Sequence, residues 1–196
     1  MKRLFDIIFS LLGLIMLLPV LLIIAILIKK EDGGPVFYRG IRIGRRGKPF
    51  RMFKFRTMVV NADQIGGPST ADDDLRITRI GKFMRKYKLD EIPQLINVLR
   101  GQMSFVGPRP EVPLYVNMFS EEEKQILTVK PGITDWASLW DSNEGAILAG
   151  SKDPEKDYME KIRPQKLRLQ LEYVRNRSFW VDMTIIFKTL LKVIKG

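Results

Sequence analysis

The sequence contains neither cysteine nor histidine in its 196 residues. These absences exclude disulfide bonds, thiolate nucleophiles, metal sites built from Cys or His, and catalytic triads that depend on His. Any chemistry must therefore be carried by carboxylates, Lys, Arg, Tyr or hydroxyl groups. The chain also lacks G-x-G-x-x-G and P-loop motifs, long repeats and heptads, so it predicts neither a dinucleotide-binding fold nor an NTPase.

Positive charge is in excess. Lys and Arg together number 33 and Asp and Glu 22, which gives a formal net charge of +11. This charge favours an anionic partner: a nucleotide, a nucleic acid or the anionic surface of a membrane. Composition does not choose among the three. The length is that of a single domain with a modest core.

A hydrophobic stretch near the N-terminus, Ile7 to Ile28, contains no charged residue. As a helix with ~1.5 Å per residue it reaches about 33 Å, enough to span a hydrocarbon core of about 30 Å. Two features oppose a spanning helix. Both flanks are basic, at residues 2–3 and 29–30, so the positive-inside rule assigns no opposite sides, and Pro19 removes a hydrogen bond near the middle. A signal peptide is disfavoured because no small-x-small cleavage site follows.

A short β-region follows the hydrophobic stretch. Pro35 to Arg39 and Phe50 to Met58 are predicted strands, and Gly44 to Pro49 between them is a predicted turn. In the second strand Lys54 and Arg56 are two positions apart, so both cations lie on one face. A solvated strand face gives the same pattern.

The segment after the strands, Asn61 to Asp74, is rich in Gly, Pro, Ser, Thr and Asp and is predicted to be a mobile loop. Its acidic run at 72–74 can be a metal site or a solvated surface. The second interpretation is favoured, because three consecutive side chains do not converge on one ion unaided. Thr78 is the predicted N-cap of a short helix that ends at Lys86 and carries Arg85 toward the next motif.

An acid pair marks the start of the next predicted helix. Asp90 and Glu91 precede Pro93, which a first helical turn tolerates, and Gly101 supplies a left-handed exit. The helix is therefore predicted to run from Glu91 to Arg100. Its positive end favours ionised carboxylates and attracts phosphate. Ordinary capping explains the same pattern, because Asp and Glu are common at these positions.

Several cations flank the acid pair in the sequence. They are Arg85, Lys86 and Lys88 before the pair, and Arg109, between Pro108 and Pro110, after it. Two acids beside cations that can hold an anionic ligand indicate phosphoryl chemistry. Ordinary surface charges are the alternative.

The run LDEIPQLINVLRGQMSFVGPRP, residues 89–110, closely resembles the signature of the monotopic phosphoglycosyl transferases, the bacterial sugar transferase family. The resemblance extends over nearly the whole chain. The run KFRTM also resembles a family motif whose lysine lies near the catalytic acids, which makes Lys54 a candidate active-site cation. The resemblance further implies a re-entrant N-terminal helix, broken at Pro19, that enters and leaves the membrane on the cytoplasmic face.

The resemblance also implies an activity: ping-pong transfer of a sugar-1-phosphate from a UDP-sugar to undecaprenyl phosphate or another polyprenol phosphate. Asp90 is implied as the nucleophile that forms a covalent intermediate while UMP leaves. Glu91 is implied as a ligand of Mg²⁺, with Asp182 as a further candidate ligand. The residues implied to bind phosphate are Lys54, Arg85, and Arg109 with its flanking Pro108 and Pro110.

Three positions depart from the commoner family pattern. Asp135 and Ser138 stand where the family commonly has Gly and then Gln, and Gln170 stands where Asp is common. These departures leave the identity of the sugar open. Trp136 and Trp140, beside them, suit either a core or a headgroup boundary.

Further helices are predicted toward the C-terminus. Ser120 and Glu123 form a capping box for a helix that ends before Pro131. Two more helices are predicted, from Asp153 to Ile162 and from Gln165 to Arg175.

The last predicted helix, Phe179 to Lys195, is amphipathic, with apolar residues on one side and lysines on the other. The apolar positions are Phe179, Met183, Ile186, Leu190 and Ile194, and the lysines are Lys188, Lys192 and Lys195. A helix packed on the core explains the apolar stripe equally well. The lysines and the neighbouring Phe179 and Trp180 favour a helix on an anionic membrane surface.

These features predict an α+β, mostly helical fold with a short β-hairpin and amphipathic membrane-surface helices. Residues 1–32 form the re-entrant membrane helix and residues 33–196 a single catalytic domain on the cytoplasmic face of the inner membrane. The expected partners are a UDP-sugar, polyprenol phosphate and anionic lipids, with Mg²⁺ as cofactor and no nucleic acid; no oligomeric state is assigned. Two alternatives stay open: a non-catalytic membrane-bound scaffold, and a basic nucleic-acid-binding module, which leaves the hydrophobic stretch unexplained.

Overall fold

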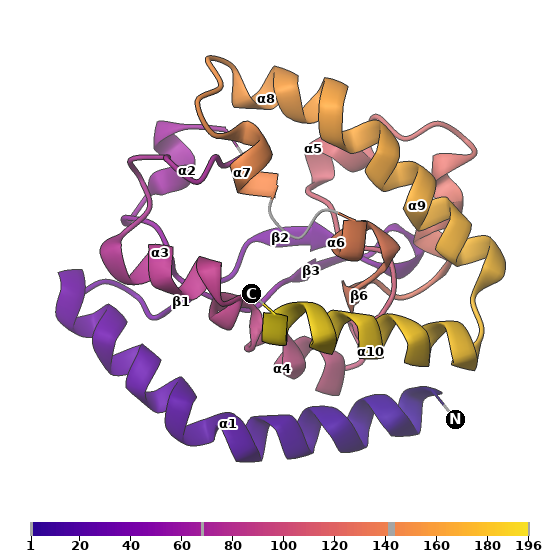
Figure 1. Cartoon of the computed structure of the whole chain (residues 1–196), viewed down its shortest axis with the longest axis horizontal. Helices are drawn as coiled ribbons and strands as arrows, with labels where there is room; N and C mark the ends of the chain where they lie inside the picture. Colours follow the sequence, from indigo (N-terminus) through magenta and orange to yellow (C-terminus); the bar gives the residue numbers. More distant parts are fainter. Residues whose placement is uncertain (1, 68, 141–143, 196) are drawn as a thin grey trace.

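The computed structural model describes residues 2–67, 69–140 and 144–195, with side chains up to residue 192. Its longest element is α1, a single helix from Lys2 to Asp32. Pro19 lies inside α1, where its ring removes one intrahelical hydrogen bond, and Figure 1 shows α1 bent about halfway along its length. The helix is therefore bent, and helical backbone continues through the position where a break was predicted.

Polar side chains attach the N-terminal end of α1 to the rest of the protein. The Lys2 ammonium pairs with the Asp182 carboxylate at 2.6 Å. Arg3 donates to the Leu99 carbonyl at 2.7 Å and so binds a carbonyl that ends another helix. Asp6, only 2% exposed, accepts a hydrogen bond at 3.0 Å from a serine hydroxyl of the central domain.

The C-terminal end of α1 is attached by apolar packing and one ion pair. Ile24 and Ile28 are buried in a cluster that includes Met84. At the last turn Asp32 pairs with Arg56. Both ends of α1 therefore contact the same globular body.

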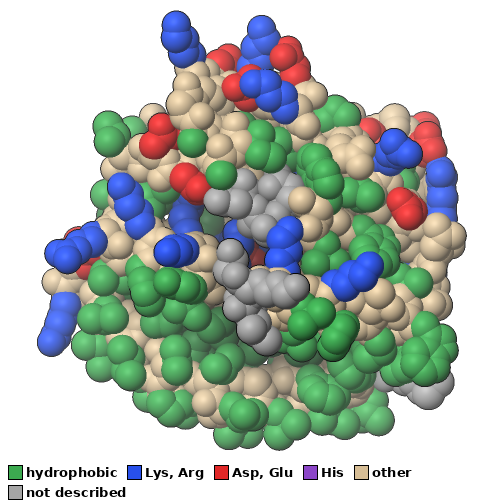
Figure 2. All heavy atoms as spheres, viewed as in Figure 1, with side chains coloured by type: hydrophobic (Ala, Val, Ile, Leu, Met, Phe, Trp, Pro, Cys, Tyr) green, Lys and Arg blue, Asp and Glu red, His purple; other side chains and the backbone are tan. Residues whose placement is uncertain are grey.

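The outer face of α1 is apolar and exposed. Within the described residues α1 is the one helix long and apolar enough to cross a membrane, with a mean hydropathy of 3.3 over its 18-residue window, of which only 11% is buried. Figure 2 shows apolar side chains along the lower edge of the molecule, over α1. A continuous apolar surface of this kind suits a hydrocarbon environment.

Four short strands form a hairpin in two parts. β1 (Phe37–Tyr38) pairs with β4 (Lys54–Phe55), and β2 (Ile41–Ile43) pairs with β3 (Pro49–Arg51), both antiparallel. The 3₁₀ turn η1 (Arg45–Gly47) connects β2 to β3 in the segment predicted as a turn.

The strands predicted over residues 35–39 and 50–58 are therefore too long. The second strand is interrupted because the Phe53 N–H donates to the buried side chain of Asn97 at 2.8 Å, in place of a strand partner. Lys54 and Arg56, which were predicted to share one strand face, have different ion-pair partners. Lys54 lies in β4 beside the acid pair, whereas Arg56 pairs with Asp32 of α1.

A parallel strand pair that the sequence did not indicate lies behind the hairpin. β5 (Ser104–Val106) pairs with β6 (Gly132–Thr134). A Cβ added to Gly132 would lie 2.1 Å from the Gly107 nitrogen, so the close approach of these two backbone segments requires glycine. The segment that leaves β5 is thereby fixed against β6.

Two helices lie between the hairpin and the acid pair. α2 (Ala62–Ile65) occupies the start of the predicted loop. α3 (Arg79–Lys86) begins as predicted at Thr78, whose side chain accepts a hydrogen bond from the Gly81 N–H. A Cβ added to Gly81 would lie 2.0 Å from the Thr57 carbonyl oxygen, so glycine lets α3 pack directly on the strand region.

The helix predicted over residues 91–100 begins later than expected. The acid pair lies in the 3₁₀ turn η2 (Leu89–Glu91), and α4 runs from Gln94 to Leu99. Pro93 has no N–H, so it interrupts the series of hydrogen bonds between the two elements. Gly101 has a φ of 77° and provides the predicted left-handed exit.

The C-terminal half is helical, and Figure 1 shows α7 and α8 above the hairpin, with α1 below it. Its elements are α5 (Pro113–Val116), η3 (Glu123–Thr128), α6 (Trp136–Trp140), α7 (Glu144–Leu148), α8 (Pro154–Asp157), the π-helical turn η4 (Tyr158–Ile162), α9 (Arg163–Asn176) and α10 (Phe179–Lys195). The capping box is confirmed, since Ser120 and Glu123 exchange hydrogen bonds at 2.7 and 3.2 Å. The break predicted between residues 162 and 165 is absent, because Pro164 is accommodated in the first turn of α9.

The terminal helix α10 has the predicted bounds and two apolar faces. Ile185 is fully buried against the core, while Trp180 and Phe187 are 77% and 63% exposed. The polar face differs from the prediction: Lys188 lies over the Trp136 ring at 5.2 Å, and Lys192 donates to a carbonyl of α6 at 2.5 Å. These two lysines therefore contact α6, whereas the outward face of α10 is aromatic and aliphatic. The side chains of Ile194 and Lys195 lie outside the described part.

Candidate active site

The acid pair is placed by a sharp turn between α3 and η2. Lys88, the N-cap of η2, has a left-handed backbone with φ 55°, which turns the chain after α3. Asp90 and Glu91 then point into the domain, and their side chains are only 8% and 13% exposed. Two neighbouring carboxylates are thus held largely away from solvent.

Both oxygens of Glu91 accept hydrogen bonds from cations. The Lys54 ammonium donates to Oε1 at 2.8 Å, and the Arg109 guanidinium donates to both oxygens, at 3.1 Å for Oε2. Burial alone would raise the pKa of Glu91, but Arg109 and Lys54 lower that pKa well below its usual value. Glu91 is therefore ionised at neutral pH.

Asp90 has a different environment. Its one ion-pair partner among the described residues is Lys54, whose Nζ lies 3.6 Å from Oδ2, and no described donor forms a hydrogen bond with its carboxylate. Burial raises the pKa of Asp90, and the positive charge of Lys54 opposes that rise. Asp90 is thus a carboxylate whose lone pairs remain available beside a cation.

Lys54 reaches both acids from the hairpin. It stands opposite Tyr38 in the β1–β4 pair. Asn97 of α4 holds the hairpin in place, because its side chain accepts from the Phe53 N–H at 2.8 Å and donates to the Arg51 carbonyl at 2.9 Å. A buried amide therefore fixes the strand that carries Lys54.

Arg109 reaches Glu91 from the segment after β5. Pro108 and Pro110 on either side restrict its backbone, and the Pro108 carbonyl accepts from the Gly132 N–H at 3.0 Å. Glu91 raises the pKa of Arg109 above its already high usual value. The guanidinium of Arg109 therefore stays protonated, and the backbone that carries it is held in place.

The predicted site residues divide into two groups. The structure brings together Lys54, Asp90, Glu91 and Arg109, which we call the acid-pair cluster. Arg85 is nearby but separate: its Nε donates to the Thr57 hydroxyl at 3.0 Å, and within the described residues it forms no ion pair with either acid. Its charge still lowers the pKa of Asp90, to a smaller extent than Lys54 does.

Asp182 belongs to a different part of the protein. It is 7% exposed in the first turn of α10, accepts from the Tyr173 hydroxyl at 2.7 Å and pairs with Lys2 at 2.6 Å. These contacts anchor α1 to α10. Neither carboxylate oxygen contacts a described residue of the acid-pair cluster, so the geometry does not support Asp182 as a ligand beside Glu91.

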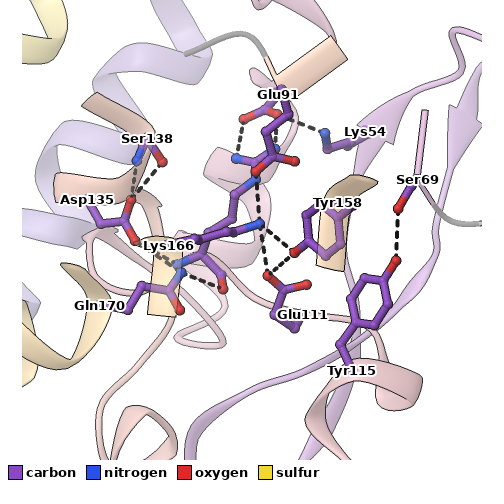
Figure 3. A network of polar contacts seen from close by, with 12 residues as sticks. Lys54, Ser69, Glu91, Glu111, Tyr115, Asp135, Ser138, Tyr158, Lys166 and Gln170 are labelled. Carbon is purple, nitrogen blue, oxygen red and sulfur yellow. Dashed lines mark hydrogen bonds and ion pairs between the residues drawn. The ribbon is translucent and has the colours of Figure 1, made fainter. Parts of the chain in front are cut away.

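A second buried charge cluster was missed by the sequence analysis. Lys166 of α9 pairs with Glu111 and Glu144, each at 2.9 Å, and donates to the Tyr158 hydroxyl at 3.2 Å. We call these four residues the Lys166 cluster, and Figure 3 shows three of them, Lys166, Glu111 and Tyr158, near Glu91 and Lys54. Their spacing in the sequence gives no common period, so only the position of Glu111 directly after Pro110 hinted at this site.

The residues of the acid-pair cluster fit Mg²⁺ only as an ion shared between a carboxylate and substrate phosphates. Within the described ranges no group of three or more Asp or Glu side chains could enclose an ion. The acidic run at 72–74 does not converge, since Asp74 pairs with Arg76 and Asp73 accepts from the Gly150 N–H. Mg²⁺ commonly binds through one or two carboxylates together with substrate phosphates, and the hard oxygens of Glu91 suit that mode.

Comparison with known proteins shows which family the sequence of this chain matches. The sequence model of a family described as bacterial sugar transferase matches residues 1–196. A UDP-N-acetylgalactosamine-undecaprenyl-phosphate N-acetylgalactosaminephosphotransferase of Aeromonas hydrophila is 36% identical, over 100% of this chain and 44% of that protein. A UDP-glucose:undecaprenyl-phosphate glucose-1-phosphate transferase of Klebsiella pneumoniae is 39% identical, over 97% of this chain and 39% of its own length.

A shorter relative matches along most of its length. The exopolysaccharide production protein ExoY of Sinorhizobium fredii is 35% identical, over 96% of this chain and 83% of that protein. The chain thus spans less than half of the two longer relatives and most of this one.

Proposed function

Because the chain belongs to the bacterial sugar transferase family, we propose that it transfers a sugar-1-phosphate from a UDP-sugar to undecaprenyl phosphate or a similar polyprenol phosphate. Several relatives carry names that describe sugar-phosphate transfer to undecaprenyl phosphate. The product would be a polyprenyl diphosphate sugar, and the reaction would begin the synthesis of a cell-surface glycan.

The observation that carries this proposal is the state of Asp90. Its carboxylate is buried, lies 3.6 Å from the Lys54 ammonium and accepts no hydrogen bond from a described residue. A carboxylate whose lone pairs are not bound, next to cations that can hold phosphate, is suited to attack phosphorus.

The first proposed step is attack by an Asp90 carboxylate oxygen on the phosphorus that carries the sugar. A new bond joins this oxygen to phosphorus, and the bond from phosphorus to the bridging oxygen of the diphosphate breaks. The electron pair leaves with UMP. Burial raises the pKa of Asp90, so the nearby Lys54 charge helps keep the anion that this attack requires.

The second proposed step regenerates the enzyme. An oxygen of polyprenol phosphate attacks the phosphorus of the aspartyl phospho-sugar, and the electron pair of the breaking bond returns to the Asp90 carboxylate. Two substrates of opposite solubility thus use one site in turn.

The cations of the site would hold phosphate oxygens during both steps. Arg109 presents a planar fork of donors that matches phosphate, and Lys54 contributes a point charge. Arg85 lies farther out and would act through its charge. Glu91 would bind Mg²⁺ together with the diphosphate, and the bound ion would supply charge neutralisation as a Lewis acid.

The contacts of α1 support a re-entrant arrangement, and we propose, as the family resemblance implies, that it lies on the cytoplasmic face of the inner membrane. Lys2 at one end pairs with Asp182, and Asp32 at the other end pairs with Arg56, so both ends contact the same domain. A straight spanning helix would separate its ends by about 30 Å across the membrane. The two sets of contacts would not then form together. The exposed apolar face of α10, which includes Trp180 and Phe187, would lie against the lipid.

Cysteine labelling tests this topology cleanly, because the chain contains no cysteine of its own. Single cysteines at Lys2 and Lys30 should both react only with a reagent applied to the cytoplasmic side. A cysteine at Lys161, an exposed position in the domain, marks that side as the control. Labelling of either helix end from outside would establish a spanning helix instead, and Pro19→Ala should push the protein in that direction.

The activity is tested with a panel of nucleotide sugars, with and without undecaprenyl phosphate, read by UMP release. Incubated with the correct donor and Mg²⁺ alone, the protein should release about one UMP per active site and gain the mass of a phospho-sugar on Asp90. UMP that appears only after acceptor is added, with no adduct by intact-protein mass spectrometry, would overturn the covalent step and leave the transferase assignment standing. Release from no donor would favour a non-catalytic scaffold.

A further inference from the structure

Asp135 is a buried carboxylate, and each of its two oxygens accepts hydrogen bonds from described residues. It follows β6, is 0% exposed, and its Oδ1 accepts from the N–H and the hydroxyl of Ser138 at 2.7 and 2.8 Å. Its Oδ2 accepts from the backbone N–H of Arg109 at 3.1 Å. Two acceptor oxygens are needed for these partners, and a carboxylate supplies both.

Gln170 of α9 adds to this arrangement. Its Nε2 lies 3.3 Å from Asp135 Oδ2 and 3.5 Å from the Arg109 carbonyl oxygen. Both neighbours are acceptors, so the nitrogen of the amide must face them. Asp135 therefore contacts the backbone N–H of Arg109, and Gln170 lies beside its carbonyl. Figure 3 shows Asp135, Ser138 and Gln170 close together.

The other restraints on this backbone act on the residues that flank Arg109, where the Pro108 carbonyl accepts from the Gly132 N–H at 3.0 Å. Pro108 and Pro110 limit the backbone torsions on either side but donate no hydrogen bond. Among the described residues, Asp135 is the acceptor for the Arg109 N–H. The guanidinium of Arg109 in turn donates to Glu91. A displacement of this backbone would therefore move a cation of the acid-pair cluster.

We propose that Asp135 is a positioning residue for Arg109: it fixes the backbone from which the guanidinium reaches Glu91 and the donor phosphate. Asp135 acts through Arg109 and touches no substrate. The role in binding the donor rests on the proposed function, whereas the hold on the Arg109 backbone does not depend on it.

Asp135→Asn is the informative variant because it preserves shape. The amide has one acceptor oxygen and a nitrogen that donates, so either Arg109 or Ser138 loses its acceptor. We expect kcat/KM for the nucleotide sugar to fall about tenfold to a hundredfold, the effect of a small displacement of a positioned group. Ser138→Ala, which removes one of the two donors to Oδ1, should have a smaller effect in the same direction.

A double-mutant cycle with Arg109→Ala separates positioning from general damage to the fold. If Asp135 acts through Arg109, then Asp135→Asn should lower kcat/KM by less than about twofold once the guanidinium is absent. Asp6→Asn is the matched control: Asp6 is another buried carboxylate, 2% exposed, that accepts from Ser104. Any effect of Asp6→Asn should be the same with and without Arg109. A full additional loss from Asp135→Asn in the Arg109→Ala background would overturn the proposal.

Amide hydrogen exchange provides a readout that needs no activity. Pro108 and Pro110 have no amide hydrogen, so Arg109 carries the only exchangeable backbone group in residues 108–110. In the full-length protein in detergent, Asp135→Asn should speed exchange of that amide by about tenfold or more, and Asp6→Asn should leave it unchanged. Unchanged exchange in Asp135→Asn would overturn the proposal, even if wild-type protein turned over no donor and the proposed function itself failed.

Discussion

The acid-pair cluster and the Lys166 cluster are built from similar groups and reach opposite electrostatic states. In the Lys166 cluster, Lys166 has both Glu111 and Glu144 at 2.9 Å and a tyrosine hydroxyl at 3.2 Å. In the acid-pair cluster, Glu91 is equally well bound, but among the described residues Asp90 has only Lys54 as a partner, at 3.6 Å. Removing one member of a buried charge cluster with a full set of partners is costly because the other charges are left unpaired, whereas a buried charge with too few partners is itself held by the fold at a cost.

The pKa directions express the same difference. Burial alone would lower the pKa of Lys166, but Glu111 and Glu144 raise it well above the usual value. Burial raises the pKa of Asp90, and its neighbouring cations only partly oppose the rise. A buried carboxylate with a raised pKa that accepts no hydrogen bond from a described residue is typical of a reactive group. The comparison therefore supports the proposed role of Asp90 in the chemistry, whereas the contacts of Lys166 are those of a structural residue.

The strongest test of the comparison is Asp90→Asn. Loss of the nucleophile should lower turnover by at least about a thousandfold and abolish the aspartyl adduct. The free energy of unfolding at pH 7 should nevertheless rise, by about 1–3 kcal/mol, because a buried charge with too few partners becomes neutral. UMP release and thermal unfolding in detergent measure the two effects. A variant that lost stability as well as activity would contradict the view of Asp90 as a destabilised carboxylate.

Lys166→Met should give the opposite result in the second cluster. It leaves Glu111 and Glu144 without their shared cation, so we expect the free energy of unfolding to fall by about 3–5 kcal/mol. Denaturant unfolding in detergent measures this change.

Lys161→Met is the matched control, since Lys161 is 56% exposed and its pair with Asp157 lies at the surface. Its loss should cost only about 0–1 kcal/mol. Equal effects of the two substitutions would remove the distinction between a saturated buried cluster and surface pairs.

Glu91→Gln should destabilise the protein where Asp90→Asn stabilises it. Arg109 and Lys54 lose their common anion, so the free energy of unfolding at pH 7 should fall by about 1–3 kcal/mol. The pKa of Glu91 is lowered on folding, so its contribution is present above the unfolded value near 4.5 and is lost as the pH falls through the lower folded value. The difference between Glu91→Gln and wild type should therefore shrink on acidification, and a difference independent of pH would show that charge is not its cause.

Lys54→Met sharpens the comparison through the pH profile. Lys54 lowers the pKa of Asp90, so its removal should move the acidic limb of the kcat/KM profile to higher pH. The direction follows because attack needs ionised Asp90, and a higher pKa means that activity is lost at a higher pH as the solution is acidified. Arg56→Met is the control, because Arg56 is a neighbouring cation that pairs with Asp32 instead. A profile of Lys54→Met that kept its acidic limb in place would exclude Lys54 as the group that tunes Asp90.

Local sequence patterns predicted many of the local structures. The capping box at Ser120 and Glu123, the N-cap at Thr78 and the left-handed Gly101 were confirmed, because each depends on residues within a few positions of one another. The bounds of α10 were confirmed for the same reason. Where a neighbour from elsewhere in the chain intervened, the prediction was wrong: Asn97 interrupts the second strand. The start of α4 was placed too early for a local reason, because Pro93 delays the helix.

The candidate site was predicted in part. The sequence motif singled out Asp90, Glu91, Lys54 and Arg109, and the structure brings these four together. It gave no sign that Glu91 would be bound by both cations while Asp90 stayed without hydrogen bonds, because neighbouring acids look alike in a sequence. Apart from the position of Glu111 directly after Pro110, it also gave no sign of the Lys166 cluster, whose members come from four separate segments.

The sequence by itself determined the chemistry that is available: no thiol, no imidazole, an apolar N-terminal helix and a carboxylate pair among cations. These properties depend on residue type and on short-range spacing. Only the tertiary structure decided which carboxylate is neutralised, that Asp182 binds Lys2 and not the site, and that Asp135 holds the backbone of Arg109. Hydrogen bonds and ion pairs depend on distances of a few ångströms between segments far apart in the chain, and packing alone sets those distances.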